Sequence, residues 1–226
     1  SLALRPAAGI TAELAYDASS GRLVLLDAAR RRVLRAPLDG TGVDGARSSW
    51  VDVPALPALQ PGGMAVDPVT GALWILDPAG RRLIHVAPDP LAATEELAMR
   101  RARVTFVPIA MEGGARLEGL ALNPADGLLY TARRDTLMLL GLDPQGRVVV
   151  RNDLASAGVT RPRGMVFAPS GDLTDDPAAL SLYVLDDPDG ARTHGHLVEV
   201  SLAQVQAPVA AATATSTSAL VHTIDS

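Results

Sequence analysis

Four segments of this chain repeat one pattern. "ELAYDASSGRLVLLD" (13–27), "GMAVDPVTGALWILD" (63–77) and "GLALNPADGLLYTAR" (119–133) align without gaps, and "GMVFAPSGD" (from 164) continues after an insertion as "LSLYVLDD" (180–187). Their starts are spaced by 50, 56 and 45 residues. A sequence that repeats at this period folds as a series of similar supersecondary units, so the repeat constrains the fold before any single motif does.

Each repeat divides into four short runs bounded by Gly, Pro and Asp, which are strand signals. The first run is apolar, as expected near an axis, and the fourth alternates, as expected at a rim. Both the period and the four runs are typical of a propeller blade. The sequence therefore predicts an all-β fold, a β-propeller with about four four-stranded antiparallel blades in a single domain over 1–226. The predicted blades cover residues 10–57, 61–110, 116–155 and 162–226.

The segment "SLALRP" at the start of the chain resembles the outer strand of one more repeat. We interpret the chain as part of a larger propeller. The alternatives are a ring closed by this chain alone and an open array of blades that pairs with a partner chain. One segment departs from the repeat: "DPLAATEELAMRRA" (89–102) has an Asp cap, an early Pro, early Glu and late Arg, and predicts an inserted helix.

Composition excludes several kinds of chemistry. The chain has no Cys, which removes disulfides and thiolate ligands, and its 20 basic residues are all Arg, which removes lysine-based catalysis. The absence of Lys also fits a bacterial genome rich in G and C. A net charge of −5 and 3% aromatic residues argue against a nucleic-acid partner, and no apolar run is long enough to span a membrane.

The sequence resembles the NHL-type and SMP-30-like β-propeller repeat proteins of bacteria. The resemblance rests on "PGGMAVDPVTGALWILDPAGRRLIHV", "LEGLALNPADGLLYTA" and "RPRGMVFAPSGD…LSLYVLDD" and covers nearly the whole chain. It implies the fold, but proteins of this kind include lactonases, esterase-like and phytase-like enzymes and many binding modules. Function must therefore be argued from a site.

Aspartates recur at two places in the repeat. Asp17, Asp67 and Asn123 end the first strands, each four residues before a glycine, and Asp27, Asp77 and Asp186 end the second strands. An Asx side chain can accept hydrogen bonds from the backbone just ahead of it, and glycine supplies a positive φ. We interpret both sets as turn-forming residues, and we expect Arg31, Arg32, Arg81 and Arg82 to lie beside the second set.

Glu118 is the candidate catalytic residue if the chain is an enzyme. The resemblance to SMP-30-like lactonases implies a metal-binding Glu before a Gly at the start of an innermost strand, which matches "LEG" at 117–119. The sequence offers no matched set of partner ligands for a hard cation such as Ca²⁺, which needs six or more oxygens. The alternative is a rim residue paired with Arg116 or Arg163.

Two acidic insertions, "SGDLTDDPAAL" (170–180) and "DDPDGARTHGH" (186–196), are the other candidate metal site. If the two loops meet on one face, their carboxylates would suit Ca²⁺, and the two histidines would suit a transition metal. The alternative is a pair of long polar loops. The candidate ligands are Asp175, Asp176, Asp186, Asp187, Asp189, His194 and His196.

No nucleophile, zinc-protease or phosphate-loop motif is present. The sequence therefore predicts a non-catalytic binding or structural module for which no cofactor is assigned, with calcium as the first candidate ion and a transition metal at the two histidines as the other. Its expected partner is a protein, a glycan or neighbouring copies of the chain, without nucleic acid and without a membrane span. We expect it outside the cell or on the cell surface, with the cytoplasm as the alternative. The rival hypothesis is a metal-dependent lactonase or esterase-like hydrolase of the SMP-30 type, with Glu118 as its anchor.

Overall fold

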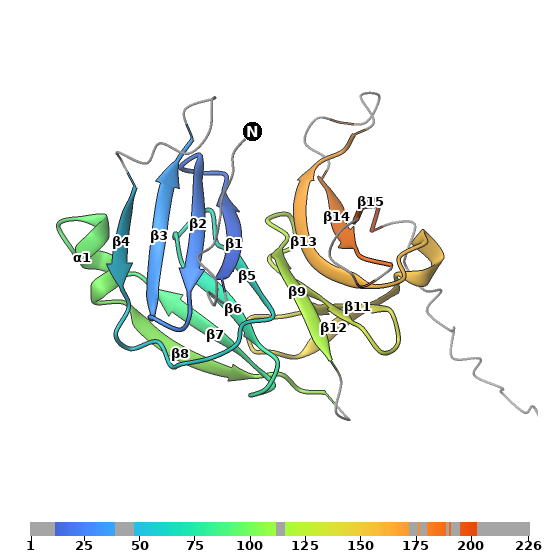
Figure 1. The fold of residues 1–226 in the computed structure, drawn as a ribbon, viewed down its shortest axis with the longest axis horizontal. Coiled ribbons are helices and arrows are strands. Elements are labelled where there is room, and N and C mark those ends of the chain that lie inside the picture. Colours follow the sequence, from blue (N-terminus) through green and yellow to red (C-terminus); the bar gives the residue numbers. More distant parts are fainter. Residues whose placement is uncertain are drawn as a thin grey trace, which may run out of the picture.

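Antiparallel sheets account for nearly all of the regular structure (Figure 1). The computed structural model describes residues 12–38, 48–111, 116–171, 176, 180–188, 190 and 195–202. Four sheets form from these residues, and each uses strands in chain order from the inside to the outside. This arrangement confirms the predicted all-β propeller with four blades.

The blades follow one another along the chain. Blade 1 consists of β1 (Ala12–Asp17), β2 (Arg22–Asp27), β3 (Arg32–Pro37) and β4 (Ser49–Asp52). Blade 2 consists of β5 (Gly63–Val66), β6 (Leu73–Asp77), β7 (Arg82–Ala87) and β8 (Arg103–Pro108). Blade 3 consists of β9 (Leu117–Leu122), β10 (Leu129–Arg133), β11 (Met138–Leu142) and β12 (Val148–Asp153). Blade 4 consists of β13 (Pro162–Pro169), β14 (Leu180–Asp186) and β15 (His196–Val200).

The predicted last strand of blade 4, "ALVHTIDS" (219–226), lies outside the described residues. The innermost strands contact one another in the order β1, β5, β9 and β13. Figure 1 shows the sheets around this line of contacts, with blades 1 and 4 at the two ends of an arc. Each blade therefore packs mainly on its neighbours in the chain, as in other repeat proteins.

Glycines at the starts of the innermost strands allow these strands to approach closely. A Cβ on Gly63 would lie 2.4 Å from the backbone nitrogen of Leu120. The N–H of Gly119, which has a φ of 72°, donates to the carbonyl oxygen of Gly62 over 2.7 Å. Blades 2 and 3 are thus joined backbone to backbone, and a side chain at Gly63 would force them apart.

Aliphatic side chains fill the space between adjacent blades. One buried cluster joins blades 1 and 2, a second joins blades 2 and 3, and a third joins blades 3 and 4. Leu26, Ile75, Leu83 and Leu139 are among the large side chains that are fully buried there. Stability of the arc therefore resides at the interfaces between blades, where strands bury one face each.

Helix α1 (Glu95–Arg100) is shorter than the helix predicted over 89–102. Its N-cap is Thr94, whose hydroxyl accepts from the N–H of Leu97 over 3.2 Å. The expected cap, Asp89, instead accepts from the N–H of Leu91 over 3.0 Å and closes a separate turn. Met99, which α1 buries, fixes the position of the helix, so packing rather than the first available cap decides where it begins.

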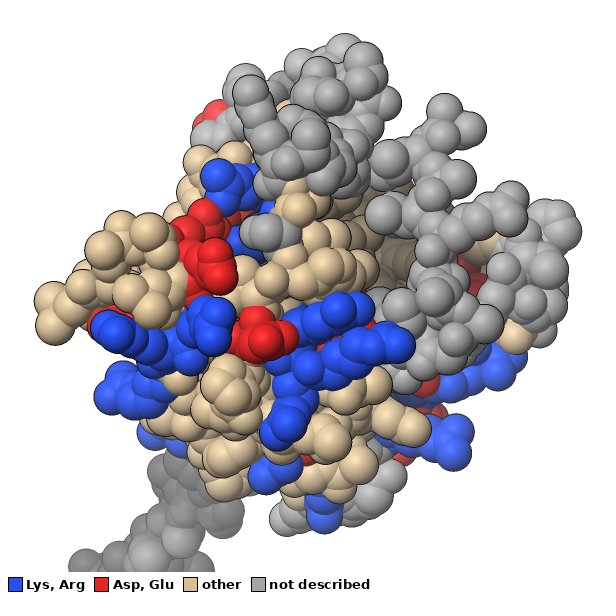
Figure 2. Space-filling model, turned by 60° about the vertical axis from the view of Figure 1, so that its left-hand side comes forward, with Lys and Arg blue, Asp and Glu red and all other residues tan. Residues whose placement is uncertain are grey.

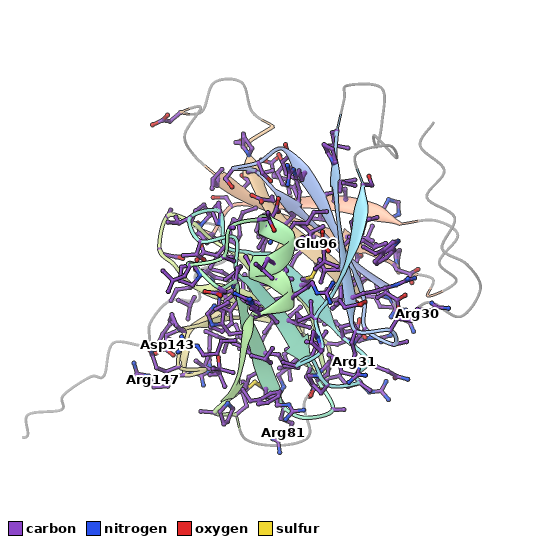
Figure 3. All side chains as sticks on the ribbon, turned by 90° about the vertical axis from the view of Figure 1, so that its left-hand side faces the viewer. Arg30, Arg31, Arg81, Glu96, Asp143 and Arg147 are labelled. Carbon is purple, nitrogen blue, oxygen red and sulfur yellow. The ribbon has the colours of Figure 1, made fainter. Side chains whose placement is uncertain are left out.

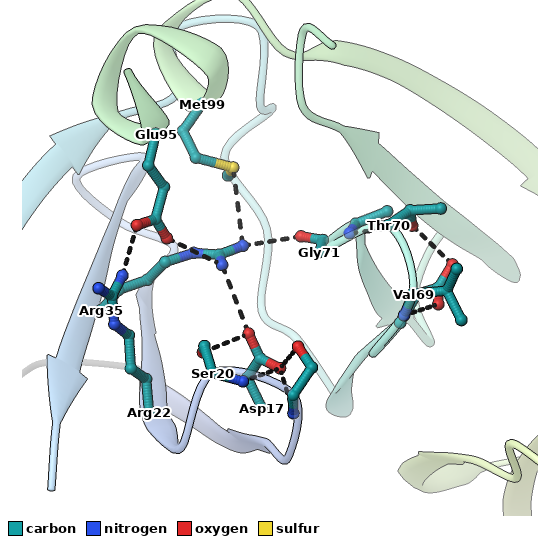
Figure 4. Close-up of polar contacts among 12 residues, drawn as sticks. Asp17, Ser20, Arg22, Arg35, Val69, Thr70, Gly71, Glu95 and Met99 are labelled. Atoms are coloured by element: carbon teal, nitrogen blue, oxygen red, sulfur yellow. Dashed lines mark hydrogen bonds and ion pairs between the residues drawn. The ribbon is translucent and has the colours of Figure 1, made fainter. Parts of the chain in front are cut away.

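Helix α1 lies against β4 and connects blade 2 to blade 1. Arg35 of blade 1 donates to the carbonyl oxygen of Gly71 over 2.7 Å and pairs with Glu95 of α1 over 3.1 Å (Figure 4). The same guanidinium lies 3.7 Å from the carboxylate of Asp17, and Arg22 also pairs with Glu95. One mostly buried arginine thus connects two blades and the inserted helix.

Charged side chains of opposite sign stand next to one another on the side of the molecule that carries α1 (Figure 2). The ion pairs Arg35–Glu95 and Arg100–Glu96 are part of this arrangement. No helix among the described residues is long and apolar enough to cross a membrane.

Candidate functional site

The residues that end the first strands form turns, as predicted. Asp67 accepts from the N–H of Val69 over 2.8 Å and from the hydroxyl of Thr70 over 2.6 Å. Asn123 and Asp17 accept in the same way from the second residue ahead, over 3.0 and 3.1 Å. Gly21, Gly71 and Gly127 follow with φ values of 66°, 68° and 71°. Burial opposes ionisation of Asp17, but hydrogen bonds from Ser19 and Ser20 outweigh it and hold the pKa of that carboxyl below its usual range.

Two residues that end second strands also form turns. Asp27 accepts from the N–H of Arg30 over 3.0 Å, and Asp77 accepts from the N–H of Gly80 over 3.0 Å. Arg32 and Arg82, at the start of the third strands, pair with these carboxylates over 3.1 and 2.8 Å.

Arg31 and Arg81, which directly precede Arg32 and Arg82, lie elsewhere than predicted. Arg31 and Arg81 occupy left-handed positions, with φ values of 53° and 51°, and Figure 3 shows them at the hairpin turns together with Arg30. In blade 3, a similar turn is closed by Asp143, which pairs with Arg147 over 2.6 Å (Figure 3). Arg31 and Arg81 both have this left-handed backbone. At the first of the two turns, Arg30 takes the place that was predicted for Arg31 and forms an ion pair of 3.1 Å with Asp27.

Asp186 has partners before β13 that the prediction did not name, and most of the hairpin that follows it lies outside the described residues. Its carboxylate accepts from the N–H and the hydroxyl of Thr160 over 3.1 and 2.9 Å, and also from the N–H of Arg161. Asp186 pairs in register with Pro162, so its side chain lies beside the segment that leads into β13. The register of the sheet therefore gives this aspartate a partner 26 residues away.

Glu118, the candidate catalytic residue, lies between two arginines. Its carboxylate pairs with Arg134 over 2.8 Å and with Arg163 over 3.6 Å. Arg163 in turn pairs with the buried Asp187 over 3.2 Å. The two carboxylates and two guanidiniums form one network between blades 3 and 4 with no net charge.

The pairing of Glu118 matches the alternative drawn from the sequence, with Arg134 in place of Arg116. Glu118 is not among the residues that line the cavity between the innermost strands. A cation at Glu118 would compete with the guanidiniums of Arg134 and Arg163 for this carboxylate.

The acidic insertions are described only in part. Asp175, Asp189 and His194 lie outside the described residues. Asp176 and His196 are exposed, whereas Asp186 and Asp187 are buried and bonded to the start of β13 and to Arg163. Within the described part of the chain, no three His, Asp or Glu side chains come together as metal ligands. Calcium binding by these insertions stays a prediction, which calorimetric titration with Ca²⁺ would test.

A cavity of about 780 Å³ lies where the innermost strands converge. All four blades contribute to its wall, with Leu14, Met64, Leu120 and Met165 among the lining residues. Among the described residues that line it, there is no carboxylate and no imidazole. The cavity therefore suits an apolar occupant and offers no ligands to a metal.

Sequence reasoning missed Glu13, which takes the place of Gly63 and Gly119 in the aligned repeats. It lies in β1, and burial raises the pKa of its carboxyl to about 7. None of the described residues donates a hydrogen bond to this carboxylate or pairs with it. The repeat alignment contained the signal, which is a Glu where the other repeats have Gly. Strands approach closely at this position, so the side chain of a Glu there must be either buried or pushed aside.

The fold and these sites define a β-propeller protein whose recurring carboxylates mostly form turns and ion pairs. Neither a known protein family nor a curated protein matches the sequence. Many solved structures match the fold. The calcium-binding protein regucalcin from Agrobacterium tumefaciens has a TM-score of 0.52 at 14% identity, over 86% of this chain and 60% of its own.

Two further structures show the same likeness. A protein of unknown function from Bacteroides thetaiotaomicron has a TM-score of 0.52 at 11% identity, over 76% of this chain and 41% of its own. Virginiamycin B lyase from Staphylococcus aureus has a TM-score of 0.46 at 15% identity, over 88% of this chain and 58% of its own. The chain thus spans 41% to 60% of the length of these three proteins, and the likeness is one of fold.

Proposed function

We propose that this chain is a non-catalytic β-propeller binding module whose partner is a neighbouring copy of itself. The observation that carries the proposal is a pair of apolar blade faces, one at each end of the arc, that correspond to the faces buried between adjacent blades. The first is the blade 1 face, defined by Leu14, Leu25, Leu34 and Trp50. The second is the blade 4 face, defined by Val166, Leu185 and Leu197.

The blade 1 face forms one continuous row across four strands. Leu14 pairs in register with Leu25, Leu25 with Leu34, and Leu34 with Trp50, so all four side chains lie on the same side of the sheet. The equivalent row in blade 2 is Met64, Ile75 and Ile84, which packs against blade 1. Met64 is 4% exposed, whereas Leu14 is 49% exposed. The same row is therefore covered in blade 2 and uncovered in blade 1.

The blade 4 face shows the same contrast with its equivalent in blade 3. Leu185 pairs in register with Leu197, as Ala132 pairs with Leu139 in blade 3. Leu139 is fully buried against blade 4, whereas Leu197 is 66% exposed. Exposed apolar rows of this kind mark surfaces that bind another protein.

The two faces are complementary by construction. Each blade has two sides, one equivalent to the blade 1 face and one equivalent to the blade 4 face. At every interface within the chain, the blade 4-type side of one blade packs on the blade 1-type side of the next. A second copy presents the same two faces, so the blade 4 face of one copy can pack on the blade 1 face of another. Contacts of this head-to-tail type close into rings when the rotation allows it.

The alternative function, a metal-dependent hydrolase, has less support. Its anchor, Glu118, pairs with Arg134 and Arg163, and the buried Asp187 is bonded to the same network. A metal-dependent lactonase would show lactone or ester hydrolysis that disappears in Glu118→Ala. We expect no hydrolysis above background in the wild type, and metal-dependent turnover would favour the hydrolase.

Sedimentation equilibrium over about a hundredfold range of protein concentration tests self-association. We expect the wild-type mass to rise above that of one chain, and we expect Leu14→Arg and Leu185→Arg each to abolish the rise, because each places a charge in an apolar contact. Leu91→Arg is the matched control, since Leu91 is 91% exposed but lies on a turn outside both faces. A wild-type mass of one chain at every concentration would overturn the proposal.

A further inference from the structure

A second cavity, of about 1000 Å³, opens between blades 2 and 3. The turns that follow β5, β7, β9 and β11 surround it, so it lies on the face of the arc that carries the Asx turns. Glu118 is the second residue of β9, and Leu122, which lines the cavity, is the last, so the cavity is separate from the Glu118 network. Its size falls in the range of about 300–1000 Å³ that holds small organic ligands.

Two stacked rings form part of the cavity wall. Trp74 in β6 and His85 in β7 pair in register, and their ring centroids lie 4.2 Å apart with an angle of 25° between the planes. Burial lowers the pKa of His85; the nearby charge of Asp67 raises it and that of Arg103 lowers it. His85 is therefore a neutral ring at neutral pH, and the pair presents aromatic surface to an apolar ligand.

Two arginines at the cavity have unused donors. Arg101 follows helix α1 and Arg103 begins β8, and both line the cavity with exposed side chains. Among the residues that the structure describes, neither guanidinium has a hydrogen-bond or ion-pair partner. A guanidinium offers five N–H donors in a planar fork, which matches a carboxylate.

The carboxylates in the wall are partly engaged. Asp67 accepts from the N–H of Val69 and the hydroxyl of Thr70, and Asp89 accepts from the N–H of Leu91. An ionised carboxylate can only accept hydrogen bonds, whereas a guanidinium can only donate them. Arg101 and Arg103 are therefore the charged donors at the cavity, and an anionic group of a ligand would bind at their end of it.

The rim of the cavity is rigid. It carries the prolines Pro68, Pro88, Pro90, Pro124 and Pro144. Proline fixes φ, so the turns that hold the rim lose little conformational freedom when a ligand binds. The rest of the wall is mostly apolar, with Leu122 and Leu129 from blade 3.

We infer that this cavity binds a small aromatic carboxylate, with its ring against Trp74 and His85 and its carboxylate on Arg101 and Arg103. The site uses neither the blade 1 face nor the blade 4 face, so it is independent of self-association. The ring supplies apolar contact, and the charge-assisted hydrogen bonds orient the ligand.

Isothermal titration calorimetry with indole-3-acetate, and with the uncharged indole-3-acetamide as the matched probe, tests the inference. We expect the wild type to bind the acid at least about tenfold more tightly than the amide, because hydrogen bonds to charged groups are the stronger ones. The double variant Arg101→Gln/Arg103→Gln should lose that preference and bind both probes equally. Arg100→Gln is the control, because Arg100 is the neighbour of Arg101 at the end of α1 but does not line the cavity.

Three outcomes would overturn the site. These are no binding of the acid by the wild type, equal binding of acid and amide by the wild type, and an unchanged preference in the double variant. A second variant, His85→Ala, tests the ring contact and should weaken both probes alike. Thermal unfolding of each variant shows that it is folded, and the two arginine substitutions are at exposed positions, so the test does not depend on His85→Ala.

Discussion

At the residue scale, most of the recurring carboxylates of this chain are structural. Asp67, Asp77 and Asn123 each accept backbone hydrogen bonds at the end of a strand, and Asp77 adds an ion pair to Arg82. A buried carboxylate is costly unless such bonds satisfy it. Among the described residues, the partly buried Glu13 has neither such a bond nor an ion pair, and its burial therefore has a consequence for stability.

Glu13→Gln is expected to stabilise the protein at high pH. Burial raises the pKa of Glu13 from 4.5 to about 7, so the folded state binds a proton more tightly than the unfolded state. Stability of the wild type therefore falls as pH rises from 4.5 to 7, and the amide removes this loss. Urea unfolding should show a gain on the order of 2 kcal/mol at pH 8 and almost none at pH 4.5.

Glu96→Gln is the control for this prediction. Glu96 is exposed on α1, so the same change of charge should alter stability little at either pH. A gain from Glu13→Gln of equal size at both values of pH would contradict the assignment of a raised pKa.

At the element scale, an inserted helix and one arginine connect two blades. Helix α1 belongs to blade 2 by sequence but lies against β4 of blade 1, and Arg35 contacts both Glu95 and the backbone of Gly71. The connection joins polar groups across an interface that is otherwise aliphatic. Arg35 is costly to remove, because the buried Asp17 would lose its charged partner.

Arg35→Met is expected to destabilise the protein by about 2–3 kcal/mol, because Asp17, Glu95 and the carbonyl of Gly71 lose a shared partner. The matched control is Arg30→Met in the same blade. Arg30 is exposed, and the buried Asp27 that it pairs with keeps Arg32 and a backbone N–H as partners, so loss of this ion pair costs less than about 1 kcal/mol. Equal midpoints of denaturant unfolding for the two variants would show that the Arg35 network adds no stability.

At the scale of the whole molecule, the arc is a row of similar blades whose faces are buried to different extents. Blades 2 and 3 are covered on both faces, whereas blades 1 and 4 each have one apolar face exposed. In such a row, stability is close to a sum over blades and the interfaces between them. The end blades should therefore open before the central ones.

Amide hydrogen exchange at a protein concentration below self-association tests this order. We expect the slowest exchange in β6 and β10, which are buried inside blades 2 and 3, and faster exchange in β2 and β14 of the end blades. Self-association at high concentration should then slow exchange selectively in blades 1 and 4. Uniform exchange across the four blades would mean that the arc unfolds as a single unit.

Strands and turns could be predicted from the sequence because both depend on neighbouring residues. The apolar runs, the Asx residues and the glycines four positions later recur in fixed order, so the four blades and their turns followed from the repeat alone. Helix α1 was predicted with the wrong beginning, because Asp89 and Thr94 are both good caps locally. Packing of Met99 chose between them, and packing is not visible in a local pattern.

Of the partners that lie far apart in the chain, one was predicted as an alternative, Arg163 beside Glu118, and the others were missed. Asp186 bonds to residues 160 and 161, Arg134 pairs with Glu118, Arg163 pairs with Asp187, and Trp74 stacks on His85 across two strands. Each contact depends on strand register or on how two blades are rotated about the axis. The sequence by itself determined the blade, since its period, turns and apolar alternation are local. Only the tertiary structure decided which carboxylates are bonded, which arginines remain unpaired and which apolar faces stay uncovered, because these depend on blades meeting in space.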